Sequence, residues 1–410
     1  MPRILHTADW HLGRRLEGRS RHDEQVAALD DIVRIANDEN VDVVIVAGDV
    51  FDSFVPPAES EALYYRTMVR LSDGGRRAVI VIAGNHDSPD RLVASDAYAR
   101  ELGITIIGFP KDLPALYDGG NDRAACIASG PSMVTLRLPR AKQPLSILAL
   151  PYPSESRLRE VISQRIDDDV AAASDYNTRI AHFMREAAQS FHPEGVNIIA
   201  SHLYVNKGIE SDSERQIQVG GAYSVDASSF PIEAAYVALG HLHRPQEQRG
   251  TNDLAVRYSG SILQYSFSEA QQQKSVTIID VDATGARHRE VAITAGRTLY
   301  QWHDVANVEE LERKLADADR LGWYSLSVFV DVPIEPEYVA KLRETHPGII
   351  DLIPRYRATD AVDGDVARMS DLSLEEQFRR FVESKYGEPV SDEVMRLFLE
   401  LTGRGGEDTP

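Results

Sequence analysis

Cysteine is almost missing from this chain, since Cys126 is the only one among 410 residues. A single cysteine excludes an internal disulfide and a cluster of thiolate metal ligands, so any metal site must use other side chains. The chain also lacks an apolar run approaching the roughly 20 residues of a membrane-spanning helix. It shows no basic and apolar signal segment before its first predicted strand. We therefore expect a cytoplasmic protein that does not contact a membrane.

Basic residues are scarce, and this shortage bears on nucleic-acid binding. The 44 lysines and arginines are outnumbered by 64 aspartates and glutamates, which leaves a formal net charge of −20. Phosphate contacts need basic side chains, so the charge of the whole chain argues against a nucleic-acid binder. The local distribution weakens that argument, because four candidates for DNA contact crowd into one short stretch: Arg14, Arg15, Arg19 and Arg21. For each of them, a solvated surface position and a phosphate contact both remain open.

The sequence does contain a repeated design, in which apolar, β-branched runs end in polar side chains. Such runs are typical of buried strands in a parallel sheet, and ligands collect at the carboxyl ends of those strands. The central run, 41–47, stops at Gly48 and Asp49. The other runs are 3–8 before Asp9 and His11, 78–83 before Asn85 and His86, 196–200 before His202, and 235–239 before His241 and His243. We predict that all of these polar groups lie on one edge of the same sheet.

The side chains at these strand ends suit divalent metal ions. Asp, Asn and His favour Mn, Fe, Zn or Co, and there are more of them here than one ion needs. Two ions about 3.5–4 Å apart, bridged by one carboxylate, form a clamp for attack at phosphorus. Asp49 is the natural bridge because it ends the central run. His86 could protonate the leaving oxygen, and Asp87 could orient His86 through a hydrogen bond.

The order of the predicted elements divides the chain into a core and a smaller unit. Residues 1–285 begin with alternating strands and helices, which indicate a parallel sheet with right-handed crossovers. Residues 286–357 are typical of a compact α+β unit. Within that unit, Asn307 and Glu310 have the spacing of a capping box, and Pro336 fits the first position of a helix.

The C-terminal part is expected to be less compact. Residues 358–370 are polar and predict a linker. Residues 371–403 predict two amphipathic helices, the first opened by Ser373. These helices have little core of their own, so they either fold back on the rest of the chain or dock on a helix of a partner. Residues 404–410 are expected to form a disordered tail.

The order of the strand-end motifs resembles that of the calcineurin-like metallophosphoesterase superfamily. In this chain the motifs are DWH at 9–11, GDVFD at 48–52, GNHD at 84–87, SH at 201–202 and GHLH at 240–243. Longer stretches, among them ILHTADWHLGRRLEGRSR and GSILQYSFSEAQQQKSV, are similar to bacterial DNA-repair nucleases of that superfamily. This similarity covers nearly the whole chain. It implies an α/β fold, a four-layer α/β/β/α sandwich with a small α+β capping domain on the DNA side and C-terminal helices.

The resemblance also implies a role for each residue of the motifs. His86 would be the catalytic histidine, and Asp87 and Asp52 would support the site from behind the ligands. The ligands of two divalent ions would be Asp9, His11, Asp49 and His243 for one ion, and Asp49, Asn85, His202 and His241 for the other. Manganese is the expected metal, with magnesium, iron and zinc as alternatives. Archaeal and eukaryotic relatives carry a second catalytic histidine where this chain has Asp52.

The activity and partners implied by the resemblance are those of a DNA nuclease in recombination, replication and repair. It would be an ATP-regulated 3′ to 5′ exonuclease on duplex ends and an endonuclease on single strands and hairpins. Its partners would be DNA, a second copy of the chain and an ABC-type ATPase. The homodimer and the ATPase would form a heterotetramer at the nucleoid, in which the coiled coil of the ATPase receives the C-terminal helices.

Two other functions would use the same motifs. A phosphatase or phosphodiesterase acting on small substrates needs the same metal centre, and the acidic net charge favours it. The residues beyond the core, with a cap and helices suited to a partner, favour the nuclease. A non-catalytic scaffold for the ATPase would tolerate the loss of site residues, whereas every site position is filled in this chain.

Overall fold

The computed structural model describes residues 1–154, 157, 176–214, 223–282, 285–356, 373–386, 390–391, 394–395 and 397–398. The predicted linker and the predicted tail lie outside these residues. The sequence also predicts a helix at 155–166, of which only residue 157 is among them. The chain forms two compact units. The first comprises Met1–Gln301, Asp319–Ser325 and Pro347–Ile350, and the second comprises Trp302–Ala318, Leu326–His346 and the described residues from Asp351 on.

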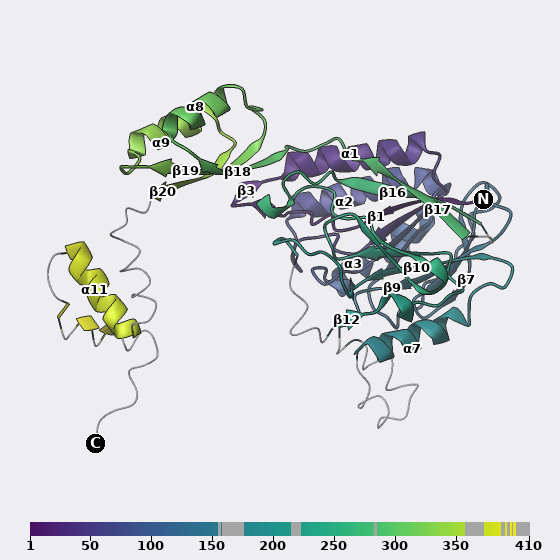
Figure 1. The fold of residues 1–410 in the computed structure, drawn as a ribbon. Helices are drawn as coiled ribbons and strands as arrows, with labels where there is room; N and C mark the ends of the chain where they lie inside the picture. Colours follow the sequence, from purple (N-terminus) through teal and green to yellow (C-terminus); the bar gives the residue numbers. More distant parts are fainter. Residues whose placement is uncertain are drawn as a thin grey trace, which may run out of the picture. The chain divides into compact units, whose positions relative to one another are not determined.

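The first sheet has the strand order β17-β16-β1-β4-β5-β6. Figure 1 labels its strands β17, β16 and β1. Its strands are β17 (Gly285–Ala292), β16 (Ser275–Asp282), β1 (Arg3–Thr7), β4 (Val43–Ala47), β5 (Ala78–Ile82) and β6 (Ile104–Ile107). The last four run parallel, whereas β16 and β17 are antiparallel to their neighbours. Because β17 pairs with β16 along its whole length, the sheet of the core extends beyond the predicted boundary at residue 285.

The second sheet has the order β14-β15-β13-β10-β9-β8-β7. Its strands are β14 (Gln246–Arg249), β15 (Ala255–Tyr258), β13 (Tyr236–Gly240), β10 (Val196–His202), β9 (Leu145–Leu150), β8 (Met133–Arg137) and β7 (Ala125–Gly130). The strands that lead to His202, His241 and His243 therefore belong to a different sheet from β1, β4 and β5. The prediction that all polar strand ends share one sheet is wrong, because the apolar pattern of a strand does not specify its neighbours.

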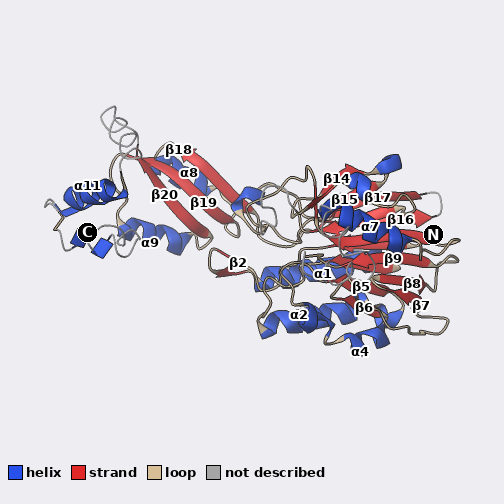
Figure 2. Cartoon of the chain, turned by 90° about the horizontal axis from the view of Figure 1, so that it is seen from below, coloured by secondary structure: helices blue, strands red, loops and turns tan. Residues whose placement is uncertain are grey.

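The two sheets pack face to face, and helices cover their outer faces (Figure 2). Between the sheets, residues such as Ile45 and Ile147 form one buried apolar cluster. Helices α1 (His22–Asp38) and α2 (Ala58–Leu71) bury their apolar faces against the outer side of the first sheet. Helix α7 (Tyr176–Ala188) does the same on the second sheet. The predicted α/β class is confirmed, and the layers follow the order helix, sheet, sheet, helix.

Pro89, a residue that favours the start of a helix, predicts one helix from residue 89 to about residue 102, but the structure breaks this segment into short pieces. The structure has α3 (Pro89–Val93), α4 (Asp96–Ala99) and a 3₁₀ turn at Arg100–Leu102. Pro89 occupies a first-turn position, as its fixed φ favours. Gly103, with φ of +70°, then ends the segment in a left-handed conformation that glycine adopts at little cost.

A smaller sheet with the order β18-β19-β20 follows the core. Its strands are β18 (Leu299–Val305), β19 (Trp323–Val330) and β20 (Ile349–Tyr356), and its helices are α8 (Val308–Ala316) and α9 (Pro336–Thr345). The predicted cap of α8 is confirmed, because Asn307 Oδ1 accepts a 2.8 Å hydrogen bond from the Glu310 amide. Pro336 begins α9 as predicted.

Helix α11 (Leu374–Tyr386) opens at the predicted serine, whose Oγ accepts a hydrogen bond from the Glu376 amide at 3.2 Å. The ring of Phe378 stacks on that of Phe398, with centroids 3.8 Å apart. The described parts of the chain contain no helix with both the length and the apolar character needed to cross a membrane.

Candidate metal centre

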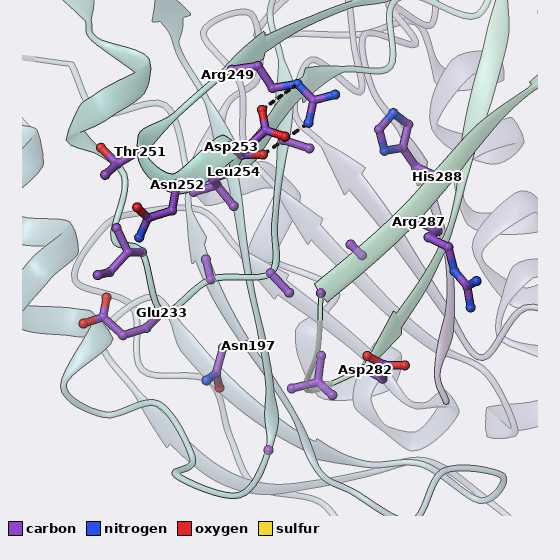
Figure 3. A pocket seen from close by; sticks show the side chains of 18 of the residues that line it. Asn197, Glu233, Arg249, Thr251, Asn252, Asp253, Leu254, Asp282, Arg287 and His288 are labelled. Atoms are coloured by element: carbon purple, nitrogen blue, oxygen red, sulfur yellow. Dashed lines mark hydrogen bonds and ion pairs between the residues drawn. The ribbon is translucent and has the colours of Figure 1, made fainter.

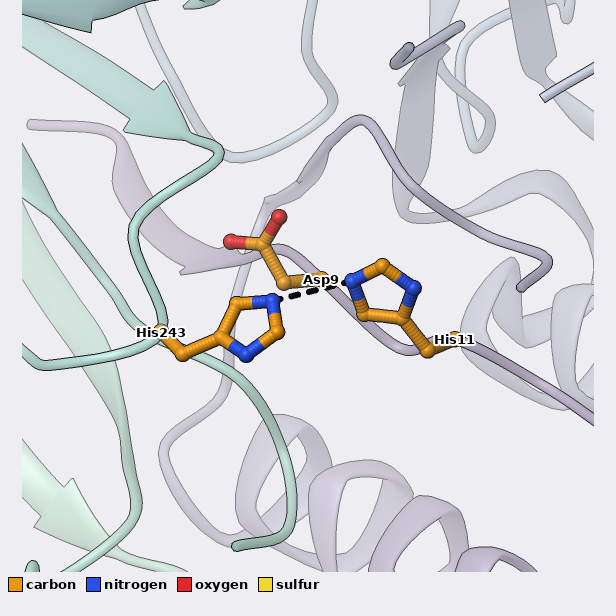
Figure 4. A group of neighbouring side chains, drawn as sticks. All are labelled: Asp9, His11 and His243. Carbon is orange, nitrogen blue, oxygen red and sulfur yellow. Dashed lines mark hydrogen bonds between the residues drawn. The ribbon is translucent and has the colours of Figure 1, made fainter. Parts of the chain in front are cut away.

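The polar groups from the two sheets meet in one buried cluster. Asp9, His11 and Asp49 follow β1 and β4 of the first sheet, and the side chains of all three are almost fully buried. His202 ends β10 of the second sheet, and His243 follows β13. Figure 4 shows Asp9 with His11 on one side and His243 on the other. The structure therefore brings together residues that lie more than 230 positions apart in the sequence.

Glycines of the motifs allow the two sheets to approach each other this closely. A Cβ atom on Gly240 would lie 1.9 Å from the carbonyl oxygen of Ala47, and one on Gly48 would lie 2.3 Å from His202 Nδ1. Both distances are far shorter than any tolerated contact, so a side chain at either position would push the strand ends apart. These glycines thus set the spacing of the cluster.

The backbone at the cluster adopts conformations that residues with a side chain rarely take. The φ angles are +53° at Asp9, +44° at His11, +49° at Asp49 and +108° at His241. Such strain persists only where the surrounding structure enforces it, and it concentrates at functional sites. Here the amides of Asp9 and His11 each donate a 3.0 Å hydrogen bond, to the carbonyl oxygens of Gly48 and Asp49 respectively. The loops after β1 and β4 are therefore locked to each other.

Three overlapping groups in the described part of the chain could each hold a metal ion, with their ligand atoms within 4.8 Å of one another. The groups are Asp9, His11 and His243; Asp9, Asp49 and His202; and His11, Asp49 and His86. Asn85 adds an amide oxygen, since its Oδ1 lies 2.9 Å from His202 Nε2 and 3.3 Å from His241 Nδ1.

The chemistry of this donor set fits a cation. The Nε2 atoms of His11 and His243 face each other at 3.0 Å, an arrangement that needs a shared proton or a cation between two lone pairs. Within the described residues, Asn85 Nδ2 and His86 Nε2 are buried without a hydrogen-bond partner. Buried polar atoms are normally paired, so these orphaned atoms indicate a site completed by a further group.

The charges of the cluster depend strongly on one another. Burial lowers the pKa of His11 to about 3, so this imidazole is neutral at pH 7 and can act as a ligand. Burial also opposes charge on His202, but the carboxylates of Asp49 and Asp9 outweigh it and raise the pKa of His202 to about 9. Burial would likewise raise the pKa of Asp49, yet His202 holds that pKa well below its usual range. An anionic carboxylate that draws positive charge into a buried cluster is the electrostatic setting of a cation site.

The structure changes the role expected for Asp87. Its carboxylate accepts hydrogen bonds from the amides of Gly84, Val50 and Phe51 at 2.8–3.1 Å. Asp87 therefore ties the loop after β5 to the loop after β4, instead of orienting the imidazole of His86 as predicted. That imidazole is oriented by the backbone, because His86 Nδ1 lies 2.9 Å from the carbonyl oxygen of Asp52. A carbonyl only accepts, so Nδ1 carries the hydrogen and Nε2 is left free.

The structure also shows polar residues that the sequence analysis missed. Glu269 and Ser213 lie behind His243, where Ser213 Oγ is 2.5 Å and Glu269 Oε1 is 3.4 Å from His243 Nδ1. Lys274 Nζ donates to Glu269 Oε2 at 2.5 Å. These residues do not follow apolar runs, so the strand-end pattern could not reveal them. The one sequence feature that could have pointed to them is the pair Glu269 and Lys274, five positions apart in the stretch GSILQYSFSEAQQQKSV that resembles the nuclease family.

The four arginines proposed for DNA contact lie in different environments. Arg15 and Arg19 are exposed on the short hairpin of β2 (Arg15–Leu16) and β3 (Arg19–Ser20). Arg14 is partly buried and donates to Asp52 Oδ1 and the carbonyl oxygen of Ser213. Arg21 is only 1% exposed, and its guanidinium donates to Glu24 at 2.6 and 2.9 Å and to Gln264 O at 2.9 Å. Arg21 therefore cannot reach a phosphate and leaves the set of DNA-contact residues.

The buried pair of Arg21 and Glu24 should instead be important for stability. We expect Arg21→Ala to lower the free energy of unfolding by about 3–5 kcal/mol, because it strands the Glu24 carboxylate in the interior. Arg34→Ala is a matched control at the same helix, since the Arg34 side chain is 55% exposed and pairs with Asp31 at the same spacing. Loss of the Arg34–Asp31 ion pair should lower the free energy of unfolding by no more than about 1 kcal/mol. Equal shifts of the urea unfolding midpoint in the two variants would contradict this assignment.

A separate cavity of about 890 Å³ lies at the opposite end of the second sheet. It is lined by residues at the amino ends of β10, β13 and β15, among them Asn197, Glu233 and Asp253 (Figure 3). Arg249 and Asp253 form an ion pair within it. This cavity contains none of the candidate metal ligands.

Comparison with known proteins assigns the chain to a family. The model of the calcineurin-like phosphoesterases matches residues 2–245. The SbcD subunit of the nuclease SbcCD from Bacillus subtilis is 42% identical over 402 residues, which cover 97% of each chain. The chain belongs to the SbcD family of calcineurin-like phosphoesterases. The predicted superfamily and the predicted nuclease family are thereby confirmed.

A second relative agrees with this assignment to the SbcD family. The SbcD subunit of the nuclease SbcCD from Rhodobacter capsulatus is 36% identical over 294 residues, which cover 71% of this chain and 69% of the relative. A solved dimetal phosphatase from Danio rerio is 14% identical, covers 72% of this chain and 99% of its own, and has a TM-score of 0.38. The phosphatase is too distant to add to the assignment.

Proposed function

We propose that this member of the SbcD family is a two-metal DNA nuclease with manganese as its metal. It acts as a 3′ to 5′ exonuclease on duplex ends and as an endonuclease on single strands and hairpins, in recombination, replication and repair. The observation that carries the proposal is the position of Asp49. Its Oδ2 lies 3.6 Å from His11 Nε2 and 3.5 Å from His202 Nε2, so one carboxylate stands between imidazoles from the two sheets.

The residues of the centre divide into two ligand sets that share Asp49. Asp9, His11 and His243 would complete one set, and Asn85, His202 and His241 would complete the other. When bound, the ions would neutralise the phosphate oxygens and lower the pKa of the attacking water. The chain itself fixes the geometry, because His202 Nδ1 donates to Ala47 O at 2.9 Å and thereby turns Nε2 toward Asp49 and Asn85.

His86 is placed to handle the proton of the leaving oxygen. Its Nδ1 is engaged by the Asp52 carbonyl, so Nε2 is the atom that can face a substrate. The His86 amide donates to Asp49 Oδ1 at 2.9 Å, which keeps the imidazole beside the bridging carboxylate. When Nε2 also carries a proton, this positioned imidazolium can donate it to the leaving oxygen as the bond to phosphorus breaks.

Exposed arginines of the β2–β3 hairpin support binding of the DNA backbone. Replacing Arg15 or Arg19 with alanine should lower duplex affinity and reduce the slope of log K against log salt by about 0.9 for each lost phosphate contact. Arg34→Ala, an exposed arginine on α1, should leave the slope unchanged. Salt titrations of binding to a labelled duplex in metal-free buffer measure these slopes. An unchanged slope in both hairpin variants would exclude these contacts.

Exposed apolar side chains support the proposed homodimer. Tyr65 and Val69, one turn apart on α2, are 42% and 53% exposed, and Phe54 and Val55 precede the helix on the surface. Exposed apolar side chains on one face of a helix, such as Tyr65 and Val69, commonly mark an interface. Val69→Glu should give a monomer by light scattering, whereas Ile232→Glu at another exposed apolar position should stay dimeric. A dimeric Val69→Glu variant would place the interface elsewhere.

We also propose that an SbcC-type ABC ATPase binds the C-terminal helices and forms a heterotetramer with the dimer. Phe381, Val394 and Leu397 are about half exposed, which leaves apolar surface for a coiled coil to cover. The α+β unit with β18–β20 would act as the DNA-facing cap. The proposed cap lies within residues 286–357, after strand β17 of the core sheet, and the proposed ATPase-binding segment is 371–403.

The experiment that tests this function compares duplexes labelled at the 3′ or the 5′ end, together with a hairpin and a small phosphodiester. The purified chain should degrade the duplex with manganese, release the 3′ label first and open the hairpin. Adding the ATPase and ATP should change the rate. Hydrolysis of the small phosphodiester alone, even with the ATPase present, would instead favour a small-molecule phosphodiesterase.

A further inference from the structure

The two ligand sets are supported by different kinds of structure. In the set that contains His202, the imidazole is oriented by a backbone carbonyl, that of Ala47. In the set that contains His11 and His243, both Nδ1 atoms instead face side chains. His11 Nδ1 lies 3.4 Å from Asp52 Oδ1, and His243 Nδ1 lies 2.5 Å from Ser213 Oγ. The His202 ring is therefore oriented by the main chain, whereas the Nδ1 atoms of His11 and His243 face side chains.

The support behind His243 is a closed, buried network. Ser213 Oγ contacts both His243 Nδ1 and Glu269 Oε1. Glu269 is 0% exposed, and its second oxygen accepts from Lys274 Nζ at 2.5 Å. Lys274 also donates to the carbonyl oxygen of His243 at 2.8 Å. The network thus contacts both the ring and the backbone carbonyl of His243.

This arrangement selects one tautomer of His243. The Glu269 carboxylate, paired with Lys274, is an acceptor, so hydrogen bonds run from His243 Nδ1 through the Ser213 hydroxyl toward it. With the hydrogen on Nδ1, Nε2 presents its lone pair toward His11 and Asp9. Carboxylates behind ligand imidazoles orient the ring and raise its basicity in this way.

Arg14 joins this network to the support behind His11. Its guanidinium donates to Asp52 Oδ1 at 3.3 Å and to the carbonyl oxygen of Ser213 at 2.8 Å. It also lies over the ring of Tyr265, 5.6 Å from the centroid. Arg14 therefore connects Asp52, which lies near His11 Nδ1, to Ser213, which lies near His243 Nδ1.

We propose that Glu269, acting through Ser213 and held by Lys274, is a positioning residue for the ion bound by the set with Asp9, His11 and His243. The inference rests on the proposed two-metal function and deepens it, because it makes the two ions unequal. The affinity of one ion depends on a buried ionic network that the other does not share.

Manganese titration of the metal-free protein, followed by calorimetry, tests the inference without measuring catalysis. We expect Glu269→Gln to weaken one of two binding events by about 10–100-fold and to leave the other unchanged. Glu247→Gln is a matched control, because Glu247 also contacts an imidazole: its Oε2 lies 2.7 Å from Nε2 of His288, which is not a candidate ligand. It should leave both events unchanged.

Ser213→Ala is the second variant, and it keeps the Glu269–Lys274 pair while removing only the bridging hydroxyl. It should weaken the same manganese-binding event. If Glu269→Gln does not fold, Ser213→Ala alone tests the positioning role. Two unaltered events in a folded Glu269→Gln or Ser213→Ala variant would overturn the positioning role and leave the pair as a structural anchor. Fewer than two events in the unsubstituted protein would instead contradict the two-metal function itself.

Discussion

Replacing Asp49 with asparagine is expected to reduce DNA cleavage by about 10³-fold or more. The substitution keeps the size of the side chain and one oxygen, but it removes the negative charge that stands between His11 and His202. A metal ion contributes several kcal/mol to the reaction, and about 4 kcal/mol corresponds to about 10³ in rate. Single-turnover cleavage of a labelled duplex at saturating manganese measures the loss.

Asp30→Asn is a suitable control for this variant, because Asp30 is an exposed carboxylate on α1 whose partner is Arg70. It should cleave at the rate of the unsubstituted protein. If Asp49→Asn retained more than a tenth of that rate, Asp49 would not be the carboxylate that joins the two ligand sets.

Replacing His86 with glutamine is expected to retain both metal ions and to lower cleavage of DNA by about 10²–10⁴-fold. This range is what a positioned proton donor contributes. The structural basis is the buried Nε2 of His86, which has no hydrogen-bond partner within the described residues, and the Asp49 carboxylate, which accepts from the His86 amide. Cleavage of DNA and manganese stoichiometry, measured on the same sample, test the two parts of the prediction.

A substrate with a better leaving group provides the control for this role. A p-nitrophenyl phosphodiester releases a stable phenolate that needs no proton, so the variant should approach the normal rate with it. His86 also lies within ligand distance of His11 and Asp49. Loss of one metal ion in the variant would therefore identify His86 as a ligand and contradict its assignment as the proton donor.

The strand-end pattern predicted the residues of the cluster because parallel strands leave their polar ends close together. Asp9, Asp49 and Asn85 follow neighbouring strands of one sheet, where this reasoning applies directly. The same reasoning assigned His202 and His241 to the wrong sheet, since buried strands of two facing sheets have the same apolar composition. The motif glycines, whose spacing role depends on contacts between the sheets, could not be interpreted before those contacts were known.

Residues outside the strand ends were predicted less well. The charge of Arg21 was visible in the sequence, but its burial depends on packing against Gln264, more than 240 positions away. Glu269 and Ser213 contact His243 from positions 26 and 30 residues away in the sequence, and no periodic pattern marks them. Asp87 adjoins His86 in the sequence, yet its carboxylate accepts hydrogen bonds from three backbone amides instead of from the His86 imidazole.

The anomalous diffraction of crystals soaked in manganese tests the proposed metal centre most directly. Two peaks are expected, one on each side of the Asp49 carboxylate. One should lie beside Asp9, His11 and His243, and the other beside Asn85, His202 and His241. A single peak, or peaks that do not contact Asp49, would contradict the two-metal centre from which the proposed nuclease mechanism is derived.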